Sequence, residues 1–159
     1  MDFKTTDLLD AHPDAEACAA GLDHYGGVRQ FSGRAVTVRC HEDNSRVREL
    51  LNGPGAGRVL VVDGGGSRRC ALVGDLLAAA GRDNGWSGVV VAGCVRDTGA
   101  LAAIPIGILA LGVQPRRSDR HGQGVVDVPV EILGARVRPG DYVYADADGV
   151  VFSVMPLTG

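Results

Sequence analysis

The chain has 159 residues, a length typical of one domain with one core, so we expect a single domain over residues 1–159. It is 45% hydrophobic and 22% charged with a net charge of −3, which excludes wholesale disorder and argues against direct nucleic-acid binding. No apolar run approaches the roughly 20 residues that span a bilayer, and the acidic N-terminus resembles no targeting signal, so we expect a cytoplasmic protein without membrane association.

The N-terminal part of the chain predicts a short helix, a strand and a second helix, in that order. Residues 6–12 carry a Thr/Asp start and an apolar pair, which is typical of a helix. Residues 31–40 alternate between apolar and polar in the way that a strand does. The next segment begins with the N-cap residues Asn44 and Ser45 and stops at Gly53, so both ends of the second helix are marked.

The middle of the chain has the pattern of a parallel sheet. Residues 58–62 and 86–95 are continuous apolar runs, as found in strands that are covered on both faces. Between them, residues 70–73 fit either a short strand or the continuation of a helix, and a helix begins at or near Asp75. Two buried strands joined through a helix form a βαβ unit, so we expect these two strands to be parallel.

A third apolar strand is predicted at residues 106–113, after which the pattern changes. The remaining residues form short β-type runs separated by turn signals such as Pro139-Gly140-Asp141 and Asp148-Gly149. The C-terminal third is therefore expected to be rich in β-strands and largely antiparallel. The predicted fold class is α/β, with a parallel βαβ core and a β-rich C-terminal third.

The residues around the second buried strand are the first candidates for chemistry. Arg96 and Asp97 follow this strand directly, and parallel sheets place their ligand-binding crevices at the carboxyl ends of strands. The helix that begins near Asp75 should start at the same edge, and the free N–H groups of Gly74 to Leu77 suit an anion such as a carboxylate. Together with a guanidinium and a carboxylate for a hard cation, this set suits a metal-bound oxo-acid.

A purely structural interpretation stays open for the same residues. Arg96 and Asp97 can form an ordinary ion pair at the end of a strand, and Gly74 with Asp75 can be no more than a helix cap. The densest charge cluster, at residues 116–120, has the ordinary interpretation of a solvated loop.

Other motifs give weaker support for a function. Residues 63–67 lack the spacing of a nucleotide-binding loop and fit a tight turn. His121 lies in a loop that can reach a site, although the pattern favours a surface position. The cysteines occur singly and the histidines lack ligand spacing, so we expect reduced thiols in or near the core and no structural zinc site.

Five segments make the chain resemble a known family over nearly its whole length. They are CHEDNSRVRELL, GRVLVVDGGGSRRCALVGD, NGWSGVVVAGCVRD, IGILALGVQP and PGDYVYADADGVV. These segments are similar to those of the RraA-like family, which contains the regulator of ribonuclease E activity A and the 4-hydroxy-4-methyl-2-oxoglutarate aldolases. The resemblance implies a swivelling β/β/α domain that assembles as a ring-shaped homotrimer, with active sites at the subunit interfaces.

The resemblance also implies roles for the residues already singled out. In the aldolase branch, the position of Arg96 contacts a small 2-oxo acid substrate, and the position of Asp97 holds a divalent metal, Mg²⁺ or Mn²⁺. The carboxylate of the substrate binds to the backbone at Gly74, Asp75, Leu76 and Leu77. The implied enzyme is a carbon–carbon lyase that cleaves 4-hydroxy-4-methyl-2-oxoglutarate to pyruvate and decarboxylates oxaloacetate.

One position departs from the aldolase pattern. The aldolases carry an acidic residue three positions after the metal-binding aspartate, where this chain has Ala100. Because retro-aldol cleavage needs a base for the C4 hydroxyl proton, we expect weak aldolase activity, with Asp75 or a carboxylate of a neighbouring subunit as the remaining catalytic base. The alternative function is a regulator without chemistry that docks on a ribonuclease E type partner. The presence of both Arg96 and Asp97 favours the enzyme.

Overall fold

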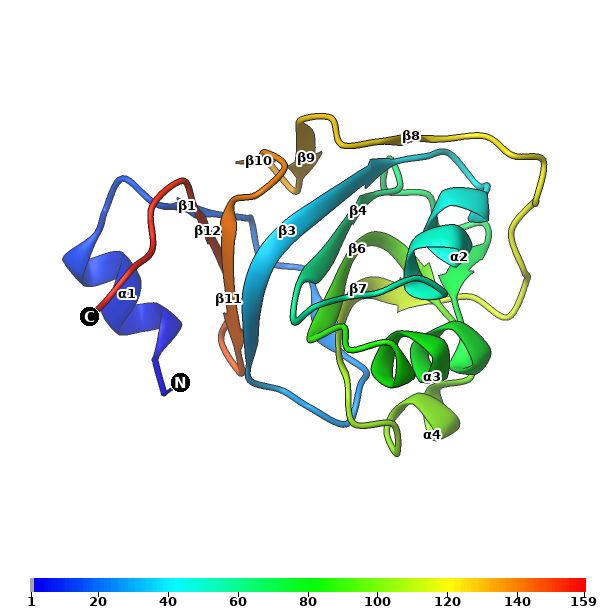
Figure 1. Cartoon of the computed structure of the whole chain (residues 1–159), viewed down its shortest axis with the longest axis horizontal. Coiled ribbons are helices and arrows are strands. Elements are labelled where there is room, and N and C mark those ends of the chain that lie inside the picture. Colours follow the sequence, from blue (N-terminus) through cyan, green and yellow to red (C-terminus); the bar gives the residue numbers. More distant parts are fainter. Residues whose placement is uncertain (1) are drawn as a thin grey trace.

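The computed structural model describes residues 2–159, in which one large curled sheet carries helices on one side (Figure 1). The order of the strands along the sheet is β1-β12-β11-β3-β4-β6-β7-β2, with β5 paired to β6 and β8 paired to β3. A second, two-stranded sheet consists of β9 and β10. The helices are α1 Thr5–Ala11, α2 Ser45–Leu51, α3 Asp75–Asp83 and α4 Thr98–Leu101. The strands are β1 Glu16–Ala17, β2 Asp23–His24, β3 Phe31–Arg39, β4 Val59–Asp63, β5 Ala71–Val73, β6 Gly88–Val95, β7 Gly107–Val113, β8 Val125–Val126, β9 Val130–Ile132, β10 Ala135–Val137, β11 Tyr142–Asp146 and β12 Gly149–Ser153.

Four neighbouring strands form the parallel half of the sheet. β3 pairs with β4, β4 with β6, and β6 with β7, all in parallel. Side chains from α2 and α3 pack on one face of these strands, and side chains from β9, β10, β11 and β12 pack on the other. Every residue of β6 is buried for this reason, which explains why the strands read as continuous apolar runs.

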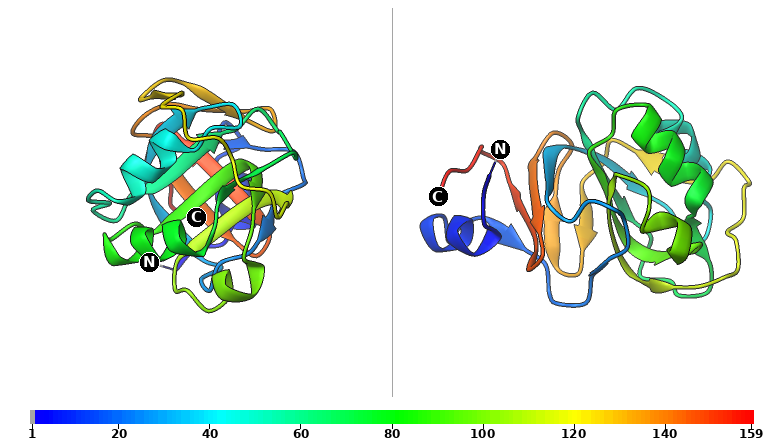
Figure 2. Two further views of the ribbon diagram at one scale, coloured as in Figure 1. Left: turned by 90° about the vertical axis from the view of Figure 1, so that its right-hand side faces the viewer. Right: turned by 90° about the horizontal axis from the view of Figure 1, so that it is seen from below.

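The antiparallel half is joined to the parallel half through β3. The first residues of β3 pair antiparallel with β11, and its later residues pair in parallel with β4. Figure 2 shows the curl that results, with β11 and β12 on the side of the sheet away from α2, α3 and α4. Phe31 begins β3, and its ring lies so close to Gly88 and Gly107 that a Cβ at either glycine would come within 2.3 or 2.0 Å of a ring carbon. Two glycines on adjacent strands thus make the space for one aromatic ring.

The α/β fold class predicted from the sequence is confirmed, with parallel strands in the middle and antiparallel hairpins in the C-terminal third. Residues 70–73, which fitted two interpretations, contribute the strand β5, parallel to β6. The sequence analysis missed the short helix α4 and the two-residue strands β1 and β2. Segments this short carry too few residues for a detectable period.

The two ends of the described chain lie together at the end of the molecule away from α2 and α3 (Figure 1). Helix α1 is anchored there by Asp146, which accepts hydrogen bonds from the backbone N–H and the hydroxyl of Thr5, both at 2.7 Å. None of the helices in residues 2–159 is long and apolar enough to cross a lipid bilayer.

Candidate active site

A pocket of about 290 Å³ opens at the carboxyl edge of the parallel strands, where the sequence predicted a site. Its wall contains Gly74, Asp75, Leu76 and Leu77 from the start of α3, and Arg96 and Asp97 from the end of β6. The tertiary structure therefore brings all six predicted residues to one pocket. The remaining wall comes from α2 and the residues that flank it, from β5, and from residues 114–124, a connection that follows β7.

Asp97 reaches back to the first turn of α3. Its Oδ2 accepts a hydrogen bond from the Asp75 N–H at 3.1 Å, while its Oδ1 has no hydrogen-bond partner within residues 2–159. The backbone of Asp97 has a φ of 61°, in the left-handed region that Asp tolerates better than most residues, and this turns the chain from β6 into α4. The N-terminus of α3 thus already attracts one anionic group.

The absence of a side chain at Gly74 allows this close approach. A Cβ at Gly74 would lie 2.7 Å from Asp97 Oδ2 and 3.3 Å from Arg96 Cγ. Arg96 is half-buried, and its Nη1 donates a hydrogen bond to the Pro115 carbonyl at 3.4 Å. Gly74 is the N-cap residue of α3, and the Asp97 carboxylate accepts the Asp75 N–H, whereas no Arg96–Asp97 ion pair is formed in the described chain.

Three further arginines face the pocket, and the sequence analysis did not select them. Arg48 comes from α2, and Arg117 and Arg120 come from the 114–124 connection. Burial and the charges of the neighbouring guanidinium groups lower the pKa of Arg120, although an arginine with a lowered pKa is still charged at neutral pH. The only signal in the sequence was the charge cluster at residues 116–120, which we had interpreted as a solvated loop.

The 114–124 connection is fixed in place by the start of α2. Asp43 is buried, and it accepts hydrogen bonds from the N–H groups of Ser45 at 2.9 Å and His121 at 2.7 Å. Burial alone would raise the pKa of Asp43, but these hydrogen bonds outweigh it, so the pKa lies below its usual value. The His121 side chain is exposed and lies outside the pocket wall.

The donor set fits a hard cation that keeps most of its water. Asp75 and Asp97 are the two carboxylates in the pocket wall, and the free Oδ1 of Asp97 is an oxygen ligand of the kind Mg²⁺ prefers. No group of three or more His, Cys, Asp or Glu side chains within residues 2–159 forms a cage around a metal. Mg²⁺ commonly binds through one or two carboxylates, with substrate and water completing its shell.

Ala100 lies on α4, is exposed, and is not part of the pocket wall. An acidic side chain at this position would therefore extend from the surface of the subunit rather than from the pocket itself. Within the described chain, Asp75 is the pocket carboxylate that remains for proton transfer if Asp97 holds a metal.

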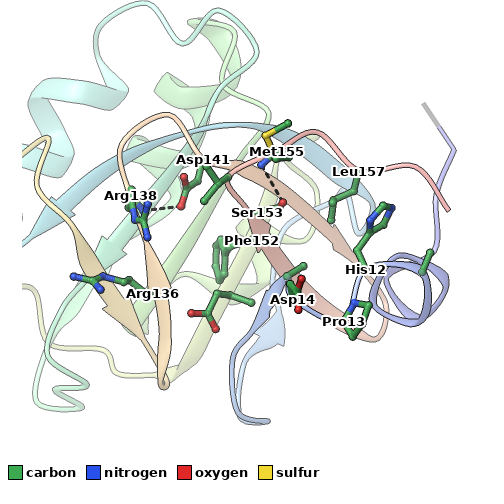
Figure 3. Close-up of a pocket in the computed structure, with 14 residues that line it drawn as sticks. His12, Pro13, Asp14, Arg136, Arg138, Asp141, Phe152, Ser153, Met155 and Leu157 are labelled. Atoms are coloured by element: carbon green, nitrogen blue, oxygen red, sulfur yellow. Dashed lines mark hydrogen bonds between the residues drawn. The ribbon is translucent and has the colours of Figure 1, made fainter.

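A second hollow, of about 420 Å³, lies at the other end of the molecule, between the end of α1, β10 and β12 (Figure 3). Its polar groups mainly hold the local turns: the Arg138 N–H donates to Asp141 at 2.8 Å, and the Met155 N–H donates to Ser153 Oγ at 3.1 Å. His12 and Ser153 also line this hollow, but no hydrogen bond links them: His12 Nε2 contacts the Thr158 carbonyl at 2.6 Å, and Ser153 Oγ accepts from Met155. This hollow is therefore not our candidate for chemistry.

Comparison with known proteins places the chain among close relatives. A profile of the family described as RraA-like (Aldolase/RraA) matches residues 5–152. A Burkholderia mallei protein, named provisionally as a 4-hydroxy-4-methyl-2-oxoglutarate aldolase, is 55% identical over 161 residues, which cover 96% of each chain. A Burkholderia pseudomallei protein with the same name is equally similar.

Solved structures with the same fold carry different names. The RNA-processing inhibitor RraA from Thermus thermophilus has a TM-score of 0.95 and 48% identity, covering 100% of this chain and 97% of that one. A Geobacillus kaustophilus structure described as an S-adenosylmethionine:2-dimethylmenaquinone methyltransferase has a TM-score of 0.92 and 48% identity, covering 97% and 96%. The names of relatives thus span three activities, and the chemistry of the pocket must decide among them.

Proposed function

The chain belongs to the RraA-like family, and from that premise we propose that it is a divalent-metal-dependent lyase acting on small 2-oxo acids. The proposed reactions are cleavage of 4-hydroxy-4-methyl-2-oxoglutarate to pyruvate and decarboxylation of oxaloacetate. One observation carries the proposal: the N-terminus of α3, Arg96 and Asp97 meet in one pocket, with the Asp97 carboxylate 3.1 Å from the Asp75 N–H.

The first task of the site is to bind the C1 carboxylate and the 2-oxo group of the substrate. The Asp75 N–H already donates to Asp97, so the N–H groups of Leu76 and Leu77 are the ones that suit the carboxylate. The first amides of a helix lack intrahelical partners and carry partial positive charge. Arg96, beside them, is placed to neutralise the charge that develops on the 2-oxo oxygen. A divalent cation held by Asp97 would supply further Lewis-acid polarisation of the same oxygen.

The second task is proton transfer. In aldol cleavage, a base takes the C4 hydroxyl proton, the C3–C4 bond breaks, and its electron pair forms the enolate of pyruvate; C4 becomes the carbonyl of a second pyruvate. Asp75 is the pocket carboxylate available for this proton. Decarboxylation of oxaloacetate needs no such base, because loss of CO₂ leaves the electron pair on C3 directly. We therefore expect decarboxylation to be the stronger activity.

A pyruvate-release assay tests the proposal. Purified protein is given oxaloacetate or 4-hydroxy-4-methyl-2-oxoglutarate, with Mg²⁺ or with EDTA, and pyruvate is followed by a coupled dehydrogenase. Enzyme-free reactions with Mg²⁺ correct for spontaneous decarboxylation of oxaloacetate. The expected result is turnover above this blank that EDTA abolishes and added Mg²⁺ or Mn²⁺ restores. Rates equal to the blank on both substrates would reject the lyase.

A second candidate function is supported by the likeness to the RNA-processing inhibitor RraA. In that case the protein would act as a homotrimer that docks on a ribonuclease E type endonuclease and inhibits it. Adding the protein to such an endonuclease and measuring cleavage of an RNA substrate tests this function directly. Inhibition that persists in a variant without lyase activity would show that docking does not depend on the pocket chemistry.

A further inference from the structure

Asn44 holds a buried oxygen atom that has no partner. The residue is 6% exposed and belongs to the wall of the same pocket. Its Nδ2 donates a hydrogen bond to the Leu72 carbonyl at 3.0 Å, while its Oδ1 is buried without any hydrogen bond. The opposite amide orientation would place Oδ1 against the Leu72 carbonyl oxygen, so the free group is an acceptor. A buried acceptor without a hydrogen bond is destabilising, which favours a ligand that donates to it.

The arginines on this side of the pocket also lack partners. Arg46, Arg69 and Arg82 each form an ion pair with a nearby carboxylate elsewhere in the fold. The side chains of Arg48, Arg117 and Arg120 form no ion pair and no hydrogen bond across residues 2–159. With Arg96, four guanidinium groups face two carboxylates, so the pocket has an excess of two positive charges. The chain as a whole carries a net charge of −3.

We call the group Asn44, Arg48, Arg117 and Arg120 the distal subsite. The arginines would bind an anion, and the free Asn44 oxygen would accept a hydrogen bond from a donor close to that anion. A carbon that carries both a carboxylate and a hydroxyl provides the two groups. We propose that the distal subsite binds the 2-hydroxycarboxylate end of a diacid, with the carboxylate on the arginines and the hydroxyl donating to Asn44 Oδ1. This inference rests on the proposed function, since the other end of the diacid would be the 2-oxo acid held at α3 and Arg96.

The backbone of the distal subsite is fixed before any ligand binds. The Arg116 carbonyl accepts a hydrogen bond from the Ala71 N–H at 2.7 Å, and the Asp119 carbonyl accepts one from the Asn44 N–H at 3.2 Å. These bonds hold both flanks of Arg117 against β5 and the start of α2. A fixed backbone reduces the entropy lost on binding, because only the arginine side chains must still be ordered by a carboxylate.

Leu76 adds an apolar contact at the same pocket. Its side chain is 82% exposed although it lines the wall, so it offers a surface for a small alkyl group on the ligand. A tertiary carbon with a methyl, a hydroxyl and a carboxylate would satisfy all three features of the pocket.

Binding of three small acids tests the subsite without any turnover. Citramalate carries a hydroxyl, a methyl and two carboxylates; methylsuccinate lacks only the hydroxyl; pyruvate lacks the distal carboxylate. Titration calorimetry is done with EDTA, so that chelation of a metal by the hydroxyl cannot contribute. We expect citramalate to bind about tenfold more tightly than methylsuccinate, which corresponds to one hydrogen bond of about 1.4 kcal/mol.

Variants assign the effect to residues. The double variant Arg48→Gln/Arg120→Gln should weaken both diacids at least tenfold and leave pyruvate unchanged. Arg82→Gln removes the same kind of charge at the far end of α3 and should change none of the three. Asn44→Ala should abolish the preference for citramalate over methylsuccinate. Because this preference is a ratio measured on one protein sample, a general loss of stability in the Asn44→Ala variant does not imitate the result.

The outcomes separate this inference from the proposed function. Equal affinities of the wild type for citramalate and methylsuccinate, or equal weakening of pyruvate and the diacids in the arginine variant, would overturn the subsite. The expected binding pattern without pyruvate release in the turnover assay would reject the lyase and retain the subsite as a diacid-binding site. Turnover with an unchanged KM for diacids in the arginine variant would retain the lyase and reject the subsite.

Discussion

Individual residues around the start of α3 combine two functions, capping a helix and shaping a pocket. Asp97 satisfies the Asp75 N–H with one carboxylate oxygen and leaves the other free. Gly74 contributes because it has no side chain, since a Cβ at this position would clash with the Asp97 carboxylate. The contacts between the end of β6 and the start of α3 therefore also hold the groups proposed for catalysis.

At the residue scale, Asp97→Asn should abolish metal-dependent pyruvate release while the fold persists. Asn still tolerates a positive φ and can accept the Asp75 hydrogen bond, but it lacks the charge that a hard cation requires. The position is exposed, so no cavity is created, and the thermal midpoint should shift by a few degrees at most. Decarboxylase rates and thermal melts of the two proteins check this. Activity near the wild-type rate would remove Asp97 from the proposed metal site.

Gly74→Ala should reduce activity by about tenfold to a hundredfold with little change in stability. The φ of −129° at Gly74 is accessible to any residue, and the atoms that a Cβ would displace belong to the side chains of Asp97 and Arg96. Gly99→Ala is the matched control, because a Cβ at Gly99 meets nothing within 4 Å. Steady-state kinetics of both variants provide the comparison. An equal loss in the two would show that the effect is not local to the pocket.

At the scale of elements, the 114–124 connection is as important to the site as the helix. It has no regular secondary structure between β7 and β8, yet it supplies Arg117 and Arg120 to the pocket. Its conformation depends on Asp43, whose two oxygens each accept a backbone N–H, one from α2 and one from the connection itself. A single buried carboxylate thus couples the two walls.

Asp43→Asn should lower the free energy of unfolding by about 1–3 kcal/mol. The NH₂ group of the new side chain would face a backbone N–H, and two donors cannot form a hydrogen bond. The pKa of Asp43 is lowered in the fold, so its contribution is present above pH 4 and is lost as the pH falls through the folded pKa. The difference between wild type and variant should therefore shrink below about pH 4. Urea unfolding at several pH values measures it. Asp119→Asn, on the same connection but exposed, should show no comparable loss.

At the scale of the whole molecule, two exposed apolar side chains belong to elements of the parallel half of the fold. Leu76 is 82% exposed and Val113, at the end of β7, is 52% exposed. Such side chains are candidates for contact with another subunit. We predict a trimer in solution, and light scattering should report about three times the chain mass of 16.4 kDa. A monomer that retains full activity would contradict this prediction.

Ala100 belongs to the same scale, because we expect a side chain at this position to influence the chemistry through a neighbouring subunit. It is exposed on α4 and lies outside the pocket of its own chain. If α4 faces the pocket of a neighbouring subunit, Ala100→Asp should raise aldol cleavage selectively and leave decarboxylation unchanged. Kinetics on both substrates test this. A uniform response of the two reactions would show that position 100 does not carry the base.

The sequence by itself determined the longer elements and one side of the pocket. Continuous apolar runs in β4, β6 and β7 predicted buried parallel strands, since only strands covered on both faces lack polar positions. The edge of such a sheet is where ligands bind, so Arg96 and the start of α3 could be selected from order along the chain alone.

Only the tertiary structure decided what faces that edge. Arg48, Arg117 and Arg120 are separated by up to 72 positions from one another along the chain, and neither a motif nor a period connects them. They share a pocket because the 114–124 connection returns to α2 and is fixed there by Asp43. Local patterns report the burial of a residue against its own element, whereas contacts between distant segments depend on how the elements pack. The free oxygen of Asn44 is visible for the same reason only in the folded chain.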